Sequence, residues 1–177
     1  MKLKTRELAI FAMLGAIMYV SKIIMEWIPN VHLLGTLTMA YTLVYRRKAL
    51  YPIYVYVFLN GALAGFNTWW VPYLYVWTVL WAVTMLLPKN MPKKAAPIVY
   101  MMVCALHGFG FGIIYAPSQA LMYGLTFEQT LAWIASGFPF DVIHGIGNFF
   151  CGMLIVPIAS VLKMLERGSG ESRYSRT

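Results

Sequence analysis

The amino-acid sequence predicts an all-α integral membrane protein, a single domain that forms a bundle of six transmembrane helices with both termini in the cytoplasm. The first observation is composition: the 177 residues are 60% hydrophobic and 11% charged, whereas about 25% of the residues of a soluble protein are charged. The second is length, because six apolar runs approach the roughly 20 residues that cross a bilayer core. The third is that the basic residues fall between alternate runs.

Charged residues, Pro or Asn bound the six expected transmembrane helices. The helices cover residues 7–28, 31–45, 50–66, 69–87, 95–115 and 138–165. The first follows a basic start but lacks a small-residue cleavage site, so we interpret it as a retained helix and not as a signal peptide. The second run is only 15 residues long, which favours a helix with little tilt or a locally thinned bilayer.

The connection 116–137 is expected to contain a short helix at the membrane surface. Thr126 and Gln129 have the spacing of a capping box, which typically starts a helix. The apolar residues 131–134 follow and favour an interfacial position. After the sixth run, residues from about 168 to 177 are polar and charged, and we expect a short disordered cytoplasmic tail there.

The basic residues determine the predicted orientation because Lys and Arg accumulate in cytoplasmic connections. Thirteen of the fourteen form four groups on one side of the predicted topology: Lys2, Lys4 and Arg6; Arg46, Arg47 and Lys48; Lys89, Lys93 and Lys94; Lys163, Arg167, Arg173 and Arg176. The connections on the other side carry no Lys or Arg. Trp27, Trp69, Trp70 and Trp133 fall at the expected outer interface, where Trp is enriched.

Charge and cysteine content disfavour several function classes. The net charge of +8 is divided among short clusters between apolar runs, which disfavours nucleic-acid binding. Cys104 and Cys151 each lie inside an apolar run, so the sequence predicts neither a disulfide framework nor a metal site of cysteines. The chain has no phosphate-binding loop, so any ATP hydrolysis that drives it must come from a partner.

Lys22 is the one basic residue outside the four groups, and Glu26 follows it by one helical turn. Ionisable groups at membrane depth are costly and often face a substrate or a polar cavity. The two residues are therefore candidate substrate contacts. The alternative is a self-neutralising pair whose lysine extends to the headgroups.

The segment 138–148 carries the clearest polar pattern. Asp141, His144 and Asn148 share one helix face at spacings of three and four residues. Three stacked polar groups are not expected to face lipid, so they line either a substrate site or a structural hydrogen-bond network between helices. Gly145, Gly147 and Gly152 would let neighbouring helices approach closely.

Aromatic and histidine residues supply further candidates. Trp70, Tyr73 and Trp77 share a helical stripe that would stack on a flat ligand, or would form ordinary bundle core or belt. His107 lies in a Gly-rich helix and is either a ligand contact or a packing residue. A metal site of His107, His144 and Asp141 lacks the usual ligand spacings, so we expect no bound metal.

The expected first helix contains Ala12 and Ala16, a pair of small residues four positions apart that favours close helix packing. Together with six spans, cytoplasmic termini, a short second helix and a polar sixth helix, this motif resembles the substrate-binding S-components of energy-coupling factor (ECF) transporters. The segment Pro-Phe-Asp-x-Ile-His-Gly-x-x-Asn, beginning at Pro139, is similar to the sixth helix of some members.

The resemblance implies a substrate-capture subunit in a bacterial cell membrane that imports a vitamin or related heterocyclic micronutrient. Ala12 and Ala16 would dock onto a transmembrane coupling subunit, and two cytoplasmic ATPases would use ATP, so this chain itself would bind no cofactor and would not be an enzyme. The implied pocket near the outer face takes in Asn30 and His32 and the segment 67–73, besides His107 and the segment 141–148.

Other function classes remain open. A stand-alone proton-coupled permease would use Asp141 and His144 as a proton relay, although the chain shows no inverted repeat. An intramembrane hydrolase would need Ser136 with one of the histidines, but the sequence before Ser136 lacks the usual glycine. A structural subunit without a ligand is the fourth class.

Overall fold

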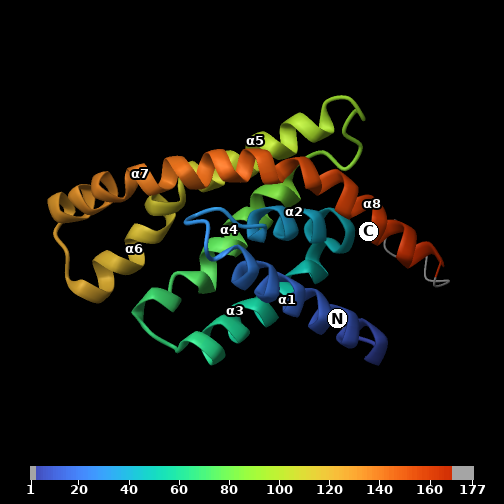
Figure 1. The fold of residues 1–177 in the computed structure, drawn as a ribbon, viewed down its shortest axis with the longest axis horizontal. Coiled ribbons are helices and arrows are strands. Elements are labelled where there is room, and N and C mark those ends of the chain that lie inside the picture. The colour runs from blue at the N-terminus through green and yellow to red at the C-terminus, as the bar shows by residue number, and fades with distance from the viewer. Residues whose placement is uncertain (1–2, 169–177) are drawn as a thin grey trace.

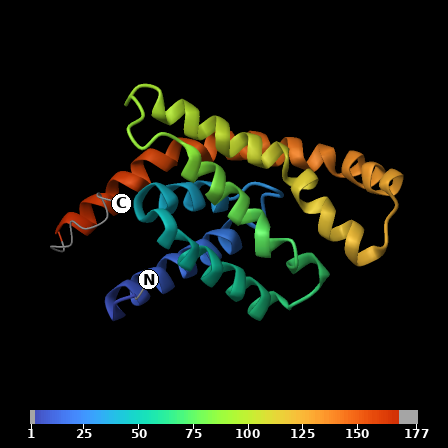
Figure 2. The ribbon, with the colours of Figure 1, turned by 180° about the vertical axis from the view of Figure 1, so that it is seen from behind.

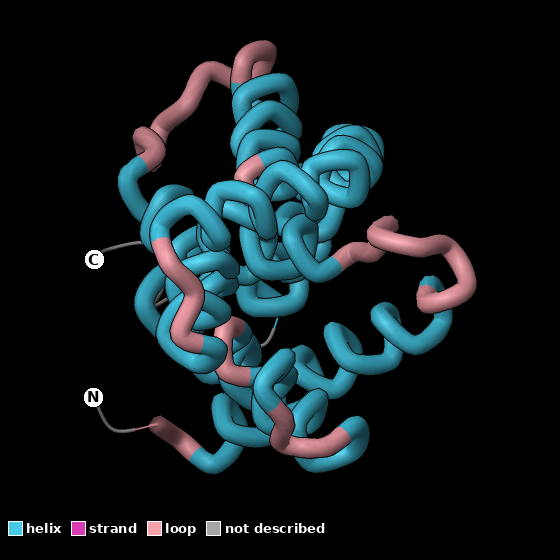
Figure 3. Tube along the Cα trace, turned by 90° about the vertical axis from the view of Figure 1, so that its left-hand side faces the viewer, coloured by secondary structure: helices cyan, strands magenta, loops and turns pink. Residues whose placement is uncertain are grey.

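The computed structural model of the chain describes residues 3–168, and this range contains helices and no strands (Figures 1 and 3). The elements are α1 (Thr5–Met25), α2 (Leu34–Tyr45), η1 (Arg46–Ala49), α3 (Leu50–Ala64), η2 (Thr68–Trp70), α4 (Tyr73–Leu86), α5 (Ala96–Phe109), α6 (Phe111–Tyr123), α7 (Phe127–Cys151), η3 (Gly152–Leu154) and α8 (Ile155–Gly168). The residues after Gly168, for which we expected a disordered tail, lie outside the described residues.

Four stretches of the described chain are long and apolar enough to cross a membrane: Thr5–Met25, Thr68–Leu86, Ala96–Tyr123 and Phe127–Arg167. Large apolar side chains also face outward, such as Ile24, which is 64% exposed. The prediction of an all-α membrane protein is therefore confirmed. The other two expected spans correspond to α2 and α3, whose 12 and 15 residues are fewer than the roughly 20 that a full crossing needs.

Two expected boundaries in the second half of the chain are wrong. The helix expected at 95–115 is α5 and α6 together, which meet at Gly110 and continue to Tyr123. The helix expected at 138–165 begins eleven residues earlier, at Phe127. Only residues 124–126 remain non-helical in the expected connection 116–137.

Local chemistry explains the early start of α7. Gly124 ends α6 in a left-handed conformation, with φ of 64°, which glycine adopts at little cost. Thr126 then caps α7, because its side chain accepts a hydrogen bond from the Gln129 amide at 3.2 Å and the Gln129 side chain accepts one from the Thr126 amide at 2.9 Å. The capping box is confirmed, but it starts a 25-residue helix and not a short interfacial one.

The first half also differs from the expected boundaries. α1 ends at Met25, and α2 begins at Leu34, so residues 26–33 form a loop that contains Pro29. α4 begins only at Tyr73, after η2 and Pro72. Pro72 is the N-cap of α4, a position at which the amide hydrogen that proline lacks would have no partner within the helix.

The centre of the bundle is α2. Eleven of its twelve residues are buried, and it contacts α1, α4, α5, α7 and α8. α1 packs along α3 on one side of it, and α5 packs along α7 on the other (Figures 1 and 2). The long helices therefore enclose the short one.

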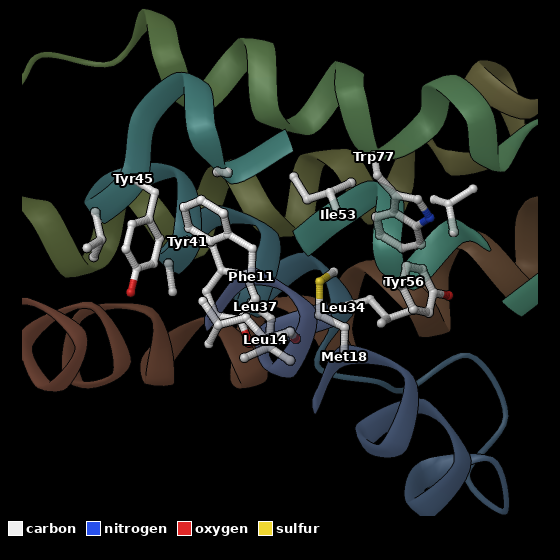
Figure 4. Packing of buried hydrophobic residues seen from close by; sticks show 14 of the residues in the cluster. Phe11, Leu14, Met18, Leu34, Leu37, Tyr41, Tyr45, Ile53, Tyr56 and Trp77 are labelled. Carbon is white, nitrogen blue, oxygen red and sulfur yellow. Dashed lines mark hydrogen bonds between the residues drawn. The ribbon is translucent and has the colours of Figure 1, made fainter. Parts of the chain in front are cut away.

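The main hydrophobic core lies between α1, α2, α3 and α4 (Figure 4). Phe11, Leu14 and Met18 form the buried face of α1. Tyr41 of α2 is 1% exposed, and its hydroxyl donates a hydrogen bond to the Leu14 carbonyl at 3.3 Å. Tyr56 and Trp77 extend this core toward the interior site described below.

The basic residues gather at one end of the bundle, where both termini, the α2–α3 turn and the α4–α5 connection lie (Figure 2). We call this region, marked by Arg46, Lys48, Lys89, Lys93, Lys163 and Arg167, the basic end. Lys48 forms an ion pair with the buried carboxylate of Glu7. If all four basic groups face the cytoplasm, they must lie at the same end of the bundle, as they do here.

The contact between α5 and α7 depends on two glycines. A Cβ atom at Gly108 would lie 2.8 Å from the Gly145 Cα, so neither helix has room for a side chain at this crossing. We expect Gly108→Ala to destabilise the protein by about 1–3 kcal/mol, because the added carbon meets backbone that cannot move independently. The measurement is thermal unfolding in detergent.

Gly137→Ala is the matched control, because Gly137 lies in α7 and a Cβ there meets no atom within 4 Å. Alanine favours helix over glycine by up to about 1 kcal/mol, so this variant should unfold at the same or a higher temperature. Equal behaviour of the two variants would contradict the close crossing.

Candidate functional site

Seven rings meet in the interior around Trp77 of α4. We call them the ring cluster: His32, Tyr56, Tyr73, Trp77, His107, Phe111 and His144. Five of these rings have centroids 5.8 to 6.1 Å from that of Trp77. The rings come from the α1–α2 loop and from five helices, and all three histidines of the chain are among them.

Several polar atoms of the ring cluster are buried without a hydrogen-bond partner in the described structure. They are His32 Nδ1, the Tyr56 hydroxyl, Trp77 Nε1, His107 Nδ1 and His144 Nε2. The side-chain amides of Asn60 and Asn148 add unpaired atoms one helical turn from Tyr56 and His144, and α2 adds the hydroxyl of Thr38. Buried polar groups are usually paired, so this concentration marks a candidate site.

The unpaired atoms include both donors and acceptors. Trp77 Nε1 and the Asn60 amide nitrogen donate, whereas the Asn148 amide oxygen accepts. His107 Nε2 lies 3.1 Å from the Val76 carbonyl, which only accepts, so Nε2 carries the hydrogen and the unpaired Nδ1 of the neutral ring is an acceptor. The site can therefore pair with a ligand that offers complementary donors and acceptors.

The loop 26–33 carries His32 into the interior. Gly147 of α7 has no side chain, and Val31 occupies the space, with its Cγ2 3.0 Å from where a Gly147 Cβ would lie. Asn30 has φ of 59°, a left-handed conformation in which Asn is enriched. The His32 ring consequently lies 4.7 Å from the ring of His144, centroid to centroid.

Asn148 lies where α2, α5 and α7 approach one another. Its amide nitrogen donates to the Cys104 carbonyl at 3.2 Å, and its oxygen is unpaired. A Cβ at Gly35 or Gly108 would lie 3.4 Å or 2.9 Å from the Asn148 amide nitrogen, so these glycines make room for the amide. Asn148 thus joins a structural contact to the polar site.

Asp141 has a different environment from His144 and Asn148. Its Oδ2 accepts a hydrogen bond from the Gly112 amide at 3.0 Å, at the start of α6. The first amides of a helix lack partners within the helix, and the carboxylate supplies one. Asp141 therefore secures the junction of α5 and α6. This contact is a structural hydrogen bond between helices, one of the two roles that its position in the sequence predicted.

Lys22 and Glu26 pair with each other at 3.6 Å. The Lys22 side chain is 22% exposed and that of Glu26 is 64% exposed, so the pair lies at the periphery of the site.

Trp70 also lies outside the ring cluster. It belongs to η2, its Nε1 donates a hydrogen bond to the Val57 carbonyl at 2.8 Å, and its ring packs on Phe66. The expected stripe therefore reduces to Tyr73 and Trp77.

Ala12 and Ala16 lie on the exposed face of α1. Gly15, between them in sequence, faces the opposite way and is buried against α3, where a Cβ would lie 2.8 Å from the Pro52 carbonyl oxygen. The small residues of α1 thus fall on two faces: Gly15 packs inside the bundle, and Ala12 and Ala16 are exposed. Ser136 is likewise exposed and donates to the Ala132 carbonyl of its own helix.

Several residues of the site were not predicted from the sequence, among them Tyr56, Asn60 and Phe111. Tyr56 and Asn60 are four residues apart on α3 and both 0% exposed, a spacing that places them on one helix face. A search for Asn within apolar runs would have found Asn60. Phe111 had no such signal, because its position depends on the break at Gly110.

Among the described residues, no group of three or more His, Cys, Asp or Glu side chains is placed to hold a metal ion. A scan of the chain against protein families, a search of the curated proteins and a search of the solved structures each found no match. The chemistry of the site therefore rests on its own residues.

The role of Asp141 can be separated from ligand binding by stability. We expect Asp141→Ala to destabilise the protein by about 1–3 kcal/mol, because the Gly112 amide would lose its partner inside the bundle. Asp141→Asn retains an acceptor oxygen and should lose less. Thermal unfolding in detergent measures both, and an Asp141→Ala protein as stable as the parent would contradict this role.

Proposed function

We propose that this chain is the substrate-capture subunit of an energy-coupling factor transporter, which imports a vitamin or related heterocyclic micronutrient with ATP hydrolysed by partner subunits. The observation that carries the proposal is the set of unpaired polar atoms around the rings of Trp77, His107 and His144. Each such atom costs about 1–3 kcal/mol while unpaired. A ligand that pairs several of them recovers this free energy on binding.

The character of the site supports a flat, polar and largely uncharged ligand. Among the described residues, none of the buried atoms without a partner belongs to Asp, Glu, Lys or Arg, and Asp141 and the Lys22–Glu26 pair are already engaged. Aromatic rings such as Trp77 and Phe111 stack on other rings. Heterocycles that carry both ring nitrogens and carbonyls match this combination of stacking and hydrogen bonding.

The proposal includes a six-span topology with cytoplasmic termini. α2 and α3 are its short second and third spans, and the enclosure of α2 by other helices lets it pass without meeting lipid along its length. The basic end faces the cytoplasm. His32 then enters the site from the outer connection, as a subunit that captures a solute outside the cell requires.

The exposed position of Ala12 and Ala16 supports docking onto a transmembrane coupling subunit through the outer face of α1. Two cytoplasmic ATPases bound to that subunit supply the energy for import. Lys22, Glu26 and Asn30 are proposed as peripheral contacts, and Trp70 holds the neighbouring α3–α4 connection.

The test of capture is mass spectrometry of small molecules released from the purified protein by denaturation. We expect one heterocyclic compound in stoichiometric amount. A protein that stays empty after growth in rich medium, and whose cells take up solute only with an intact proton gradient, would replace this proposal with the permease.

Tyr56→Phe is the sharpest variant for the same site, because it removes only a hydroxyl that has no partner. We expect unchanged or higher stability of the empty protein and about tenfold weaker ligand binding, the effect of one lost hydrogen bond. Tyr54→Phe, two residues away, is the control: its hydroxyl donates to the Leu74 carbonyl at 2.8 Å. That variant should keep the ligand, and equal losses would place the site elsewhere.

Docking is tested by Ala12→Trp and Ala16→Trp, which add a large side chain to the exposed face of α1. We expect both variants to retain ligand but to lose copurification with the coupling subunit and ATPases, because a close helix crossing has no room for indole. Ile17→Trp changes a residue that is 48% exposed on the neighbouring face and should keep the complex. Intact complexes in all three variants would exclude this docking surface.

A further inference from the structure

A cavity of about 820 Å³ lies at the basic end, away from the ring cluster. Basic side chains from three segments line it: Arg46 of η1, Lys89 and Lys93 of the α4–α5 connection, and Lys163 and Arg167 of α8. Among the described lining residues Glu166 is the one acidic side chain, and it accepts a hydrogen bond from the Tyr45 hydroxyl at 3.1 Å. The described lining therefore holds five basic side chains against one acidic side chain.

The rest of the lining is largely apolar and comes from the interior of the bundle. Leu43 and Val44 of α2, Tyr100 of α5, and Val156 and Ala159 of α8 contribute to it. Tyr100 is 8% exposed and Ala159 5%, so this wall belongs to the packed interior, and both residues lie in stretches that are long and apolar enough to cross a membrane. The cavity thus joins an apolar wall to a basic rim at the end of the bundle.

Arg46 is held in place at the edge of this cavity. Its backbone has φ of 52° and ψ of −120°, a conformation with positive φ that is strained for a residue other than glycine. Two residues of α4 secure it: Trp81 Nε1 donates to the Arg46 carbonyl at 3.1 Å, and the Arg46 guanidinium donates to the Met85 carbonyl at 3.0 Å. Further guanidinium donors are available for a ligand.

We propose that this cavity binds the phosphate group of an anionic glycerophospholipid, with the acyl chains against its apolar wall. Arginine and lysine recognise phosphate oxygens by charge-assisted hydrogen bonds. Basic pockets between helices on the cytoplasmic side of a membrane suit anionic headgroups. A free phosphate shares the headgroup chemistry but makes no use of the apolar wall. The site is distinct from the ring cluster and does not depend on which solute that cluster binds.

The experiment is native mass spectrometry of the full chain in detergent, titrated with dioleoyl phosphatidylglycerol, with dioleoyl phosphatidylcholine or with inorganic phosphate. We expect saturable binding of one phosphatidylglycerol at a concentration at least tenfold below that at which phosphatidylcholine binds. Equal binding of the two lipids would overturn the proposal. Inorganic phosphate that competes at the same concentration as phosphatidylglycerol would overturn the lipid assignment in favour of a free phosphate.

Two neighbouring lysines provide a matched pair of variants. Lys93 lines the cavity and Lys94 does not, although both are exposed. Lys93→Gln should weaken phosphatidylglycerol binding about fivefold, the effect of one basic contact with a headgroup, whereas Lys94→Gln should leave it unchanged. Equal losses would mean that the lipid responds only to overall charge, and would overturn the site.

Arg46→Gly tests the site without disturbing the fold. Glycine adopts a positive φ readily, and this gain offsets the loss of the hydrogen bond from the guanidinium to the Met85 carbonyl, so the variant should unfold at about the temperature of the parent in the absence of lipid. Phosphatidylglycerol binding should weaken by at least fivefold, because a fixed guanidinium is lost. Undiminished binding by this variant would overturn the role of Arg46 in the cavity.

Discussion

The whole arrangement depends on the burial of one short helix, α2. Its residues are apolar or small and uncharged on every side, and a helix of this kind is stable only when other helices cover it. α1, α4, α5, α7 and α8 supply the cover. Because α2 fills the centre, these helices pack around it. Side chains from several of them meet beyond the first residue of α2 and again beyond its last. The ring cluster lies near its first residues, and the basic cavity lies near its last.

The two sites follow from the same constraint but have opposite electrostatics. Near Leu34 the converging side chains are neutral rings and amides, which can be buried at membrane depth at moderate cost. Near Tyr45 the helix ends, and basic side chains line a cavity there, where water or headgroups can solvate the charges. The two ends of α2 therefore have surroundings that suit different kinds of ligand.

Much of this organisation could be predicted from the sequence, because composition and the spacing of charges depend on the bilayer more than on details of packing. His144 and Asn148 were expected on one face, and both reach the interior. Asp141 shares that face in sequence but meets Gly112, since the neighbouring helix breaks at Gly110. That break depends on tertiary contacts that a single helical pattern does not contain.

The start of α7 and the site residues on α3 were not predicted, because the local sequence signals for them are weak. The capping box at Thr126 was recognised, but the sixth span was expected to begin only at residue 138, whereas α7 begins at Phe127 and contains Pro139. Tyr56 and Asn60 lie in an apolar run that contains no charged residue, so the sequence gives no sign of a polar site there. A single buried amide gives a weak signal in sequence, and its importance is evident only from the unpaired atoms around it.

The break at Gly110 also bears on how the protein fits membranes of different thickness. The stretch Ala96–Tyr123 has 28 residues, and as one straight helix it would extend about 42 Å, well beyond a hydrocarbon core about 30 Å thick. The junction of α5 and α6 divides this length into two segments that meet at an angle (Figure 1). The Asp141 carboxylate holds the Gly112 amide at this junction, and His107 and Phe111 flank it. A change of the angle would therefore move rings of the ring cluster, so a thinner or thicker bilayer has to adapt to the protein by deforming locally.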